Sequence, residues 1–161
     1  MRKNVFACPP IPRVGEGKRG ETGHIGYLLR QACTAYRILM EKTLVDLGVT
    51  PPQFSVLTMI ASYPGVSGAD LARLSLLTPQ TVSVIVNNLE KAGWVARRPH
   101  DQHGRIQVLE ITDAGKELLL RCNALVHAAE ARLMDGVGPA DEQVVRRWLV
   151  TVACGSKDPG F

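Results

Sequence analysis

The chain has no apolar run of the ~18–20 residues that a membrane-spanning helix needs. Its N-terminus carries charges but lacks the apolar core of a secretion signal. Aromatic residues make up only 5% of the 161 residues, whereas 45% are hydrophobic, a balance typical of a mainly helical soluble protein. We therefore expect a cytoplasmic protein of one domain, or a small domain with helical extensions, and no membrane partner.

Sequence signatures of enzymes and of metal sites are also missing. The chain has no glycine-rich phosphate-binding loop and no Ser/His/Asp arrangement in a catalytic context. Its cysteines contain no Cys-x-x-Cys pair, and its histidines show no spacing typical of zinc ligands. We therefore expect no catalytic residue, no cofactor and no metal. Reduced thiols are expected at Cys8, Cys33, Cys122 and Cys154.

One segment, from Thr78 to Lys91, carries the strongest functional signal. Thr78 can cap a helix with its hydroxyl, and Pro79 suits the first helical position. An apolar stripe at helical spacing predicts a buried face, made by Val82, Ile85, Val86 and Leu89. The opposite face is rich in short amide and hydroxyl groups, which donate and accept hydrogen bonds as the base edges of a DNA major groove require. An ordinary amphipathic surface helix is the competing interpretation.

The flanking segments favour a helix-turn-helix followed by a β-hairpin. Ser67 begins a capping-box-like motif at the start of a short helix, and residues 75–77 form a short connector. Gly93 can end the second helix in the left-handed conformation. Segments 94–98 and 105–111 have strand character and are joined by turn residues. This order predicts a winged helix-turn-helix, a mainly α fold with a small β-hairpin wing (α+β).

Residues 24–149 resemble the MarR family of bacterial winged-helix regulators. The motifs that carry the resemblance follow in the family's order and spacing: L-A-R-L (71–74), L-T-P-Q-T-V-S (77–83), L-E-K-A-G-W-V (89–95), R-R-P (97–99) and L-E-I-T-D-A-G (109–115). Together they are far more specific than a single helix-turn-helix match. The resemblance implies a homodimeric transcriptional regulator, commonly a repressor, that binds double-stranded operator DNA.

Long amphipathic helices outside the winged helix indicate where a second subunit binds. Residues 24–48 hold apolar positions at helical spacing, and this stripe is longer than a small winged helix can cover. We therefore expect a homodimer. The predicted division is a flexible basic arm (1–23), an N-terminal dimerisation helix (24–48), the winged helix-turn-helix (50–113), C-terminal dimerisation helices (114–153) and a frayed tail (154–161).

Bulk charge is too small to hold this chain on DNA. The formal net charge is +4, and the first 23 residues carry five Lys or Arg against two Glu, so the remainder is nearly neutral. Local basic groups, doubled by dimerisation, must therefore contact the phosphates. The basic arm either touches phosphates or is simply solvated. The residues predicted to contact DNA are Ser67, Thr78, Gln80, Thr81, Ser83, Val84, Asn87, Asn88, Lys91, Arg97, Arg98, His103 and Arg105.

Some positions depart from the pattern of the resembled family. Many relatives have Arg in place of Val84 and often of Asn88, which argues against direct guanine recognition by this helix. Contact of Val84 with a thymine methyl is the substitute hypothesis. An Asn bidentate to adenine would contribute ~1–3 kcal/mol of discrimination. In the wing, His103 occupies the position of the carboxylate that usually holds Arg105, and Asp101 is an alternative partner. In a dimer, the two recognition helices would enter successive major grooves, ~10 bp apart.

The resemblance also implies an effector, commonly a small phenolic or carboxylate compound whose binding releases the DNA. Arg30 could pair with a carboxylate of such a ligand. Packing in the dimer interface is the alternative role of the two tyrosines, and a surface charge that of Arg30. The predicted ligand-binding residues are His24, Tyr27, Arg30 and Tyr36.

Two alternative functions remain. In the family's organic-peroxide sensors the reactive Cys lies near the start of the first helix, where this chain has Gly26. Cys33 lies two turns further on, and Arg30 and Arg37, each one turn away, could favour its thiolate. The other alternative is a winged helix that binds protein, which the polar outer face of residues 78–91 disfavours.

Overall fold

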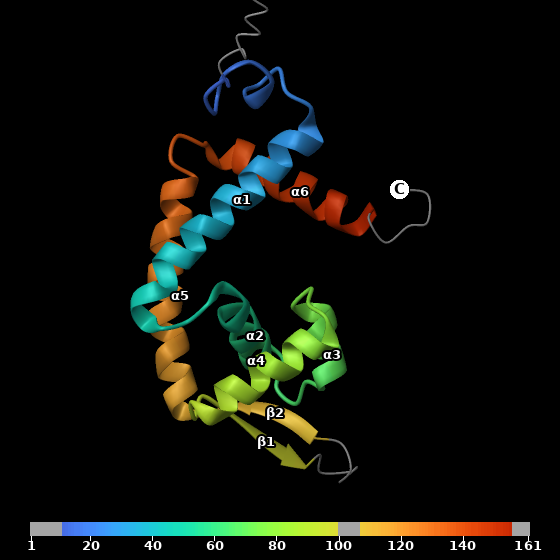
Figure 1. Cartoon of the computed structure of the whole chain (residues 1–161), viewed down its shortest axis with the longest axis vertical. Coiled ribbons are helices and arrows are strands. Elements are labelled where there is room, and N and C mark those ends of the chain that lie inside the picture. The colour runs from blue at the N-terminus through green and yellow to red at the C-terminus, as the bar shows by residue number, and fades with distance from the viewer. Residues whose placement is uncertain (1–10, 100–106, 156–161) are drawn as a thin grey trace, which may run out of the picture. The chain divides into compact units, whose positions relative to one another are not determined.

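The structure, a computed structural model, describes residues 11–99 and 107–155 (Figure 1). This part of the chain contains six α-helices and one two-stranded antiparallel sheet. The predicted fold class, mainly α with a β-hairpin wing, is therefore confirmed. The chain divides into two compact units, residues 1–42 and residues 43–161.

In the first unit, residues 11–23 fold into turns and the short 3₁₀ helix η1, Gly17–Arg19. The Arg19 guanidinium donates to the carbonyl oxygen of Pro12 at 2.9 Å and to Oε1 of Gln31 at 3.3 Å. Gln31 belongs to helix α1, Ile25–Leu44, so Arg19 ties this segment to the helix. These contacts differ from the flexible arm that the proline and glycine content predicts. The first ten residues of that arm lie outside the described residues.

Helix α1 ends at Leu44, before the boundary at residue 48 that the sequence predicts. The 3₁₀ helix η2, Val45–Leu47, follows, and Gly48 ends it at a left-handed φ of 64°. Thr50 then begins helix α2, Pro51–Ser62. Its hydroxyl accepts from the backbone N–H of Gln53 at 3.4 Å, and the Gln53 side chain accepts from the backbone N–H of Thr50 at 2.9 Å. This capping box satisfies two donors at the start of α2.

Helix α2 lies at the centre of the core of the second unit. Helix α2 packs against α3 (Gly68–Leu74), α4 (Pro79–Lys91) and the hairpin of β1 (Val95–Pro99) and β2 (Gln107–Ile111). This hairpin, whose strands pair from Val95 with Ile111 to Pro99 with Gln107, is the wing. The largest fully buried side chains are Leu44, Leu57, Ile60, Leu71 and Leu89.

Helix α5, Asp113–Leu133, starts against the turn between α4 and β1. The Thr112 hydroxyl donates to the carbonyl oxygen of Gly93 at 2.7 Å and accepts from the backbone N–H of Gly115 at 3.1 Å. The backbone N–H of Thr112 also donates to the carbonyl oxygen of Trp94 at 3.1 Å. Gly93 has the left-handed φ, 76°, that the sequence predicts for the end of α4. These bonds fix the start of α5 to the base of the wing.

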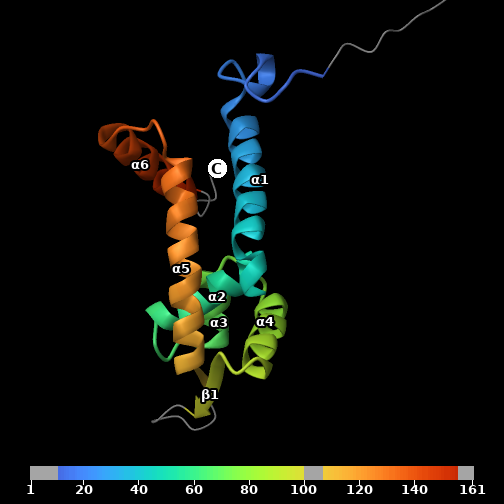
Figure 2. The same ribbon diagram turned by 90° about the vertical axis from the view of Figure 1, so that its left-hand side faces the viewer.

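Helix α6, Pro139–Gly155, follows α5 at the end that lies away from the wing (Figure 2). Its apolar side chains Val144, Val145, Trp148 and Leu149 are exposed in the part of the chain that the structure describes. Within the described residues, no single helix has the length and apolar content to cross a membrane. The bent pair 25–47 and 51–62 meets these criteria only when its two helices are taken together.

Candidate nucleic-acid interface

The helix-turn-helix is built from two short helices with capped N-termini. At α3, the Ser67 hydroxyl accepts from the backbone N–H of Asp70 at 3.2 Å and donates to its carboxylate at 2.7 Å. At α4, the Thr78 hydroxyl accepts from the backbone N–H of Thr81 at 3.2 Å, and the two threonine hydroxyls lie 2.9 Å apart. Pro79 occupies the first turn of α4. Both predicted caps are therefore present.

The turn between these helices contains a strained residue that the sequence does not indicate. Leu76 has a left-handed φ of 55°, the one positive φ outside glycine in the described chain. Its side chain is 89% exposed. Left-handed turn positions are usually signalled by Gly or Asn, and Leu gives no such signal. The turn therefore presents an apolar side chain to solvent just before α4.

Helix α4 separates an apolar face from a polar one as predicted. Val82, Ile85, Val86 and Leu89 are buried. The residues of α4 that are predicted to contact DNA are all exposed: Gln80, Thr81, Ser83, Val84, Asn87, Asn88 and Lys91. Thr78 is also exposed, and Ser67 is half-buried. The outer face of α4 from Gln80 to Asn88 therefore offers hydroxyl and amide groups, one apolar side chain at Val84, and no charge.

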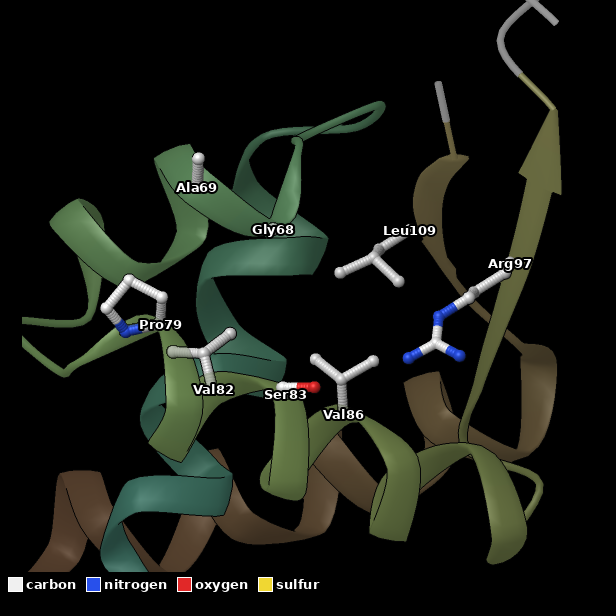
Figure 3. Close-up of a pocket in the computed structure, with 8 residues that line it drawn as sticks. All are labelled: Gly68, Ala69, Pro79, Val82, Ser83, Val86, Arg97 and Leu109. Atoms are coloured by element: carbon white, nitrogen blue, oxygen red, sulfur yellow. The ribbon is translucent and has the colours of Figure 1, made fainter. Parts of the chain in front are cut away.

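Arg97 joins the wing to α4. Its guanidinium reaches from β1 toward the helix (Figure 3), where Nη2 donates to Oδ1 of Asn87 at 2.7 Å. Nη1 lies 3.0 Å from Oε2 of Glu90. The structure thus brings together Asn87 and Arg97, two residues predicted to contact DNA separately. The sequence analysis did not identify Glu90, whose only signal was its position one turn after Asn87.

The second arginine of the wing is also paired within the chain. Arg98 Nε lies 2.8 Å from Oε2 of Glu110 on the neighbouring strand. Lys91 is exposed and has no ion-pair partner in the part of the chain that the structure describes. His103 and Arg105, the predicted contacts at the wing tip, lie outside the described residues. Among the described cations that are predicted to contact DNA, Lys91 is therefore the one whose charge is not offset by a glutamate.

A cavity of about 280 Å³ lies between α3, α4 and the wing (Figure 3). Val82, Val86 and Leu109 give it an apolar wall, and Ser83 and Arg97 add polar atoms. Arg97 lines this cavity, so its side chain is not enclosed on that side. The hydrogen bond and ion pair to α4 are what fix the guanidinium.

A second cavity, of about 440 Å³, lies within the first unit. Two of the four predicted ligand-binding residues, Tyr27 and Arg30, line it, whereas His24 and Tyr36 do not. Arg19 lines it as well, so two arginines border the same cavity. The remaining lining residues are Val14, Gln31, Thr34, Ala35 and Ile38. The sequence analysis missed Arg19, whose signal was the basic composition of the arm.

The cysteines differ in their surroundings. Cys33 is exposed, but Arg37, one of its two neighbouring cations, is ion-paired with Glu41 at 3.3 Å. Cys122 is buried, and this burial raises the pKa of its thiol above the ordinary value, with the Arg121 cation opposing the shift. Cys154 is exposed, and Cys8 lies outside the described residues. In the described chain, no three His, Cys, Asp or Glu side chains gather as metal ligands would.

Comparison with known proteins agrees with this architecture. A sequence model described as MarR family matches residues 47–106. The HTH-type transcriptional repressor Rv2887 of Mycobacterium tuberculosis is 35% identical over 125 residues, which cover 78% of this chain and 90% of the repressor. The solved structure of Rv2887 with salicylic acid is 33% identical with a TM-score of 0.66, and the match covers 82% of this chain and 98% of that chain. The repressor CouR of Rhodococcus jostii RHA1 has been solved bound to a 23-mer DNA duplex. It is 27% identical with a TM-score of 0.77, and the match covers 86% of this chain and 99% of the CouR chain.

Proposed function

Because the chain belongs to the MarR family of winged helix-turn-helix regulators, we propose that it is a dimeric transcriptional repressor that acts on DNA in the cytoplasm. It binds a pseudo-palindromic operator through α4 and the wing. The observation that carries this proposal is the outer face of α4, which is exposed, polar and uncharged from Gln80 to Asn88. Such a face suits the donor and acceptor pattern of major-groove base edges.

In the proposed complex, the two α4 helices of a dimer enter major grooves whose centres are about one helical turn, ~10 bp, apart. The N-terminal residues of a recognition helix commonly contact base edges, which assigns this role to Gln80, Thr81 and Ser83. Lys91 contacts a phosphate, and the wing reaches the flanking minor groove through Arg105. The relative Rv2887 is a repressor, which supports repression as the direction of control.

A gel-shift titration against the promoter next to the protein's own gene, at two salt concentrations, tests this function. The parent is expected to bind specifically, with an affinity that falls steeply as salt rises. Gln80→Ala should weaken specific binding about tenfold or more, because a good base contact contributes roughly 1–3 kcal/mol. Gln143→Ala, the same change at an exposed position of α6, is the matched control and should bind like the parent.

Two results would contradict the proposal at different points. Equal binding by Gln80→Ala and the parent would mean that α4 does not read the bases. Failure to bind the nearby promoter would be followed by selection from random duplexes. Failure there too would favour the alternative of a protein-binding winged helix.

We further propose an effector that combines a carboxylate with an aromatic ring and binds the groove of the first unit. Rv2887 has been solved with salicylic acid, a compound of this class. The groove offers the Arg30 guanidinium, which has no hydrogen-bond or ion-pair partner within the described residues, beside Tyr27 and Arg19. Arginine binds carboxylates through two parallel hydrogen bonds, and Tyr27 and Ile38 supply apolar surface for a ring.

Salicylate is the probe for this site. It should lower the DNA affinity of the parent, whereas Arg30→Ala should need about tenfold more salicylate for the same effect, since a hydrogen bond to a charged group contributes roughly 1.5–3 kcal/mol. Arg37→Ala removes a guanidinium that is already paired with Glu41 on the same helix, so it should respond like the parent. An unchanged response of Arg30→Ala would place the effector elsewhere, and an unresponsive parent would exclude this class of effector.

A further inference from the structure

We propose that Arg97 is a positioning residue for base recognition. Held by Glu90, it fixes the Asn87 side-chain amide in one orientation, so that the donor end of the amide is the end left free for DNA. This inference rests on the proposed function, in which α4 enters the major groove. It changes the role expected for Arg97, because the sequence predicts that Asn87 and Arg97 each contact DNA.

The chemistry of the two side chains determines the orientation of the amide. A guanidinium has five N–H donors and no acceptor, whereas an asparagine amide has one acceptor end and one donor end. Arg97 Nη2 lies 2.7 Å from the Asn87 side chain, within the range of charge-assisted hydrogen bonds. Asn87 must therefore turn Oδ1 toward Arg97, since the reverse orientation would place N–H against N–H. Nδ2, at the other end of the amide, points away from Arg97 and makes no hydrogen bond within the described residues.

Glu90 keeps Arg97 in this place. Its carboxylate binds Nη1 at 3.0 Å while Nη2 binds Asn87, so the planar guanidinium is held at two points on α4. The side chains of Arg97 and Glu90 are 36% and 32% exposed, so water screens this pair only in part. Glu90 also offsets the positive charge that a phosphate contact would need. The geometry therefore favours alignment of Asn87 over attraction of the DNA backbone.

The fixed amide changes which base Asn87 can recognise. A free Asn pairs with adenine by donating to N7 and accepting from the N6 amino group. In this structure Oδ1 is turned toward Arg97 and accepts from Nη2 through one of its two lone pairs, so the donor end is the end left free to meet a base. A donor can bind the acceptors of guanine (N7 and O6) and thymine (O4). It cannot bind the amino group of cytosine, which is itself a donor. We expect one position in each half-site at which guanine or thymine is preferred over adenine.

The test compares base preference and salt dependence in the full chain. Binding is measured on a selected operator and on all its single-base variants, for the parent, Arg97→Met and Asn87→Asp. In Arg97→Met the amide is free to rotate, so the guanine or thymine preference at one position should shift toward adenine by about tenfold. Asn87→Asp retains an acceptor for Arg97 but lacks the donor. In this variant the guanine or thymine preference should vanish at that one operator position, while the base preferences at the other operator positions stay unchanged. For Arg97→Met, the slope of log affinity against log salt concentration should equal the slope measured for the parent.

Arg146→Met is the matched control, because Arg146 pairs with Glu142 on α6, outside the winged helix, and is not among the residues predicted to contact DNA. Its base preference should equal that of the parent. The inference is overturned if Arg97→Met weakens binding equally on all sequences and lowers the salt slope by about 0.9 for each subunit, as loss of a phosphate contact would. It is also overturned if Asn87→Asp keeps the parent's preference.

Circular dichroism establishes that each variant is folded, and Asn87→Asp decides the question by itself if Arg97→Met does not fold. A parent that shows no sequence preference at any position would instead overturn the proposed function, and the inference with it. The two failures are therefore distinguishable.

Discussion

The α-carbon of Gly115 lies so close to the carbonyl oxygen of Trp94 that a Cβ atom built on Gly115 would come within 2.1 Å of that oxygen. The same atom would lie 2.8 Å from Cγ1 of Ile111. The Trp94 oxygen accepts a hydrogen bond from the backbone N–H of Thr112 and so cannot withdraw without losing it. We expect Gly115→Ala to lower the free energy of unfolding by about 1–3 kcal/mol, as overpacking does. Urea denaturation measures this change.

Gly68→Ala provides the control for that substitution. Gly68 lies at the start of α3, and a Cβ atom there would meet nothing within 4 Å. Its free energy of unfolding should stay within about 0.5 kcal/mol of the parent, as for most surface changes. If the two variants were destabilised equally, the close approach to Trp94 would not be the reason why position 115 requires glycine.

Leu76→Gly should stabilise the protein. The left-handed φ of Leu76 costs a residue with a Cβ atom roughly 1–2 kcal/mol, and glycine at this position avoids that cost. Glycine also has a larger conformational entropy in the unfolded chain, which offsets part of the stabilisation. The side chain is 89% exposed, so little packing is lost. We expect a net increase of roughly 0.5 kcal/mol in the free energy of unfolding. Leu76→Ala keeps the strain and should unfold like the parent, and a destabilised Leu76→Gly would mean that the Leu76 side chain makes stabilising contacts.

Much of the winged helix can be predicted from the sequence because local signals agree with one another there. Thr78 and Pro79 start α4, the apolar spacing of Val82 and Leu89 matches its buried face, and Gly93 ends it. Each of these features depends on residues within one or two turns. The helices and the two strands therefore appear close to their predicted positions.

Contacts between distant residues were not predictable in the same way. Arg97 reaches back ten positions to Asn87, and this contact depends on how the wing folds against α4 rather than on any local pattern. The folded arrangement of residues 11–23 likewise depends on the contact between Arg19 and Gln31. The left-handed Leu76 has no sequence signal because its residue type argues against that conformation.

Trp148→Glu should convert the proposed dimer to a monomer. Trp148 is 41% exposed on α6, beside the exposed Val144, Val145 and Leu149. A second subunit that covers this face would have to bury the new carboxylate, which is costly without a partner. Sedimentation velocity should show the parent as a dimer and Trp148→Glu at the monomer mass. Gln143→Glu introduces the same charge at another exposed position of α6 and should remain dimeric. A dimeric Trp148→Glu would exclude this face from the interface.

Burial of Cys122 should make the stability of the protein depend on pH in the alkaline range. Because burial raises the pKa of this thiol in the folded state, the unfolded chain releases the proton first, near the ordinary thiol pKa of about 8.5. Above that pH, release of the proton favours unfolding, so the stability that Cys122 contributes is complete at lower pH and falls as pH rises. Urea denaturation between pH 7 and 10 should therefore show a steeper loss of stability for the parent than for Cys122→Ala.

Cys33→Ala tests whether the steeper loss of stability between pH 7 and 10 is due to the buried thiol of Cys122. Cys33 is exposed, so its removal should leave the pH dependence of the parent unchanged. Iodoacetamide applied to the folded protein at pH 8 should modify Cys33 and Cys154 and spare Cys122, because the reagent needs an accessible thiolate. Modification of Cys122 at the same rate as Cys33 would mean that α5 opens readily at this position. The burial that raises its pKa would then not persist in solution.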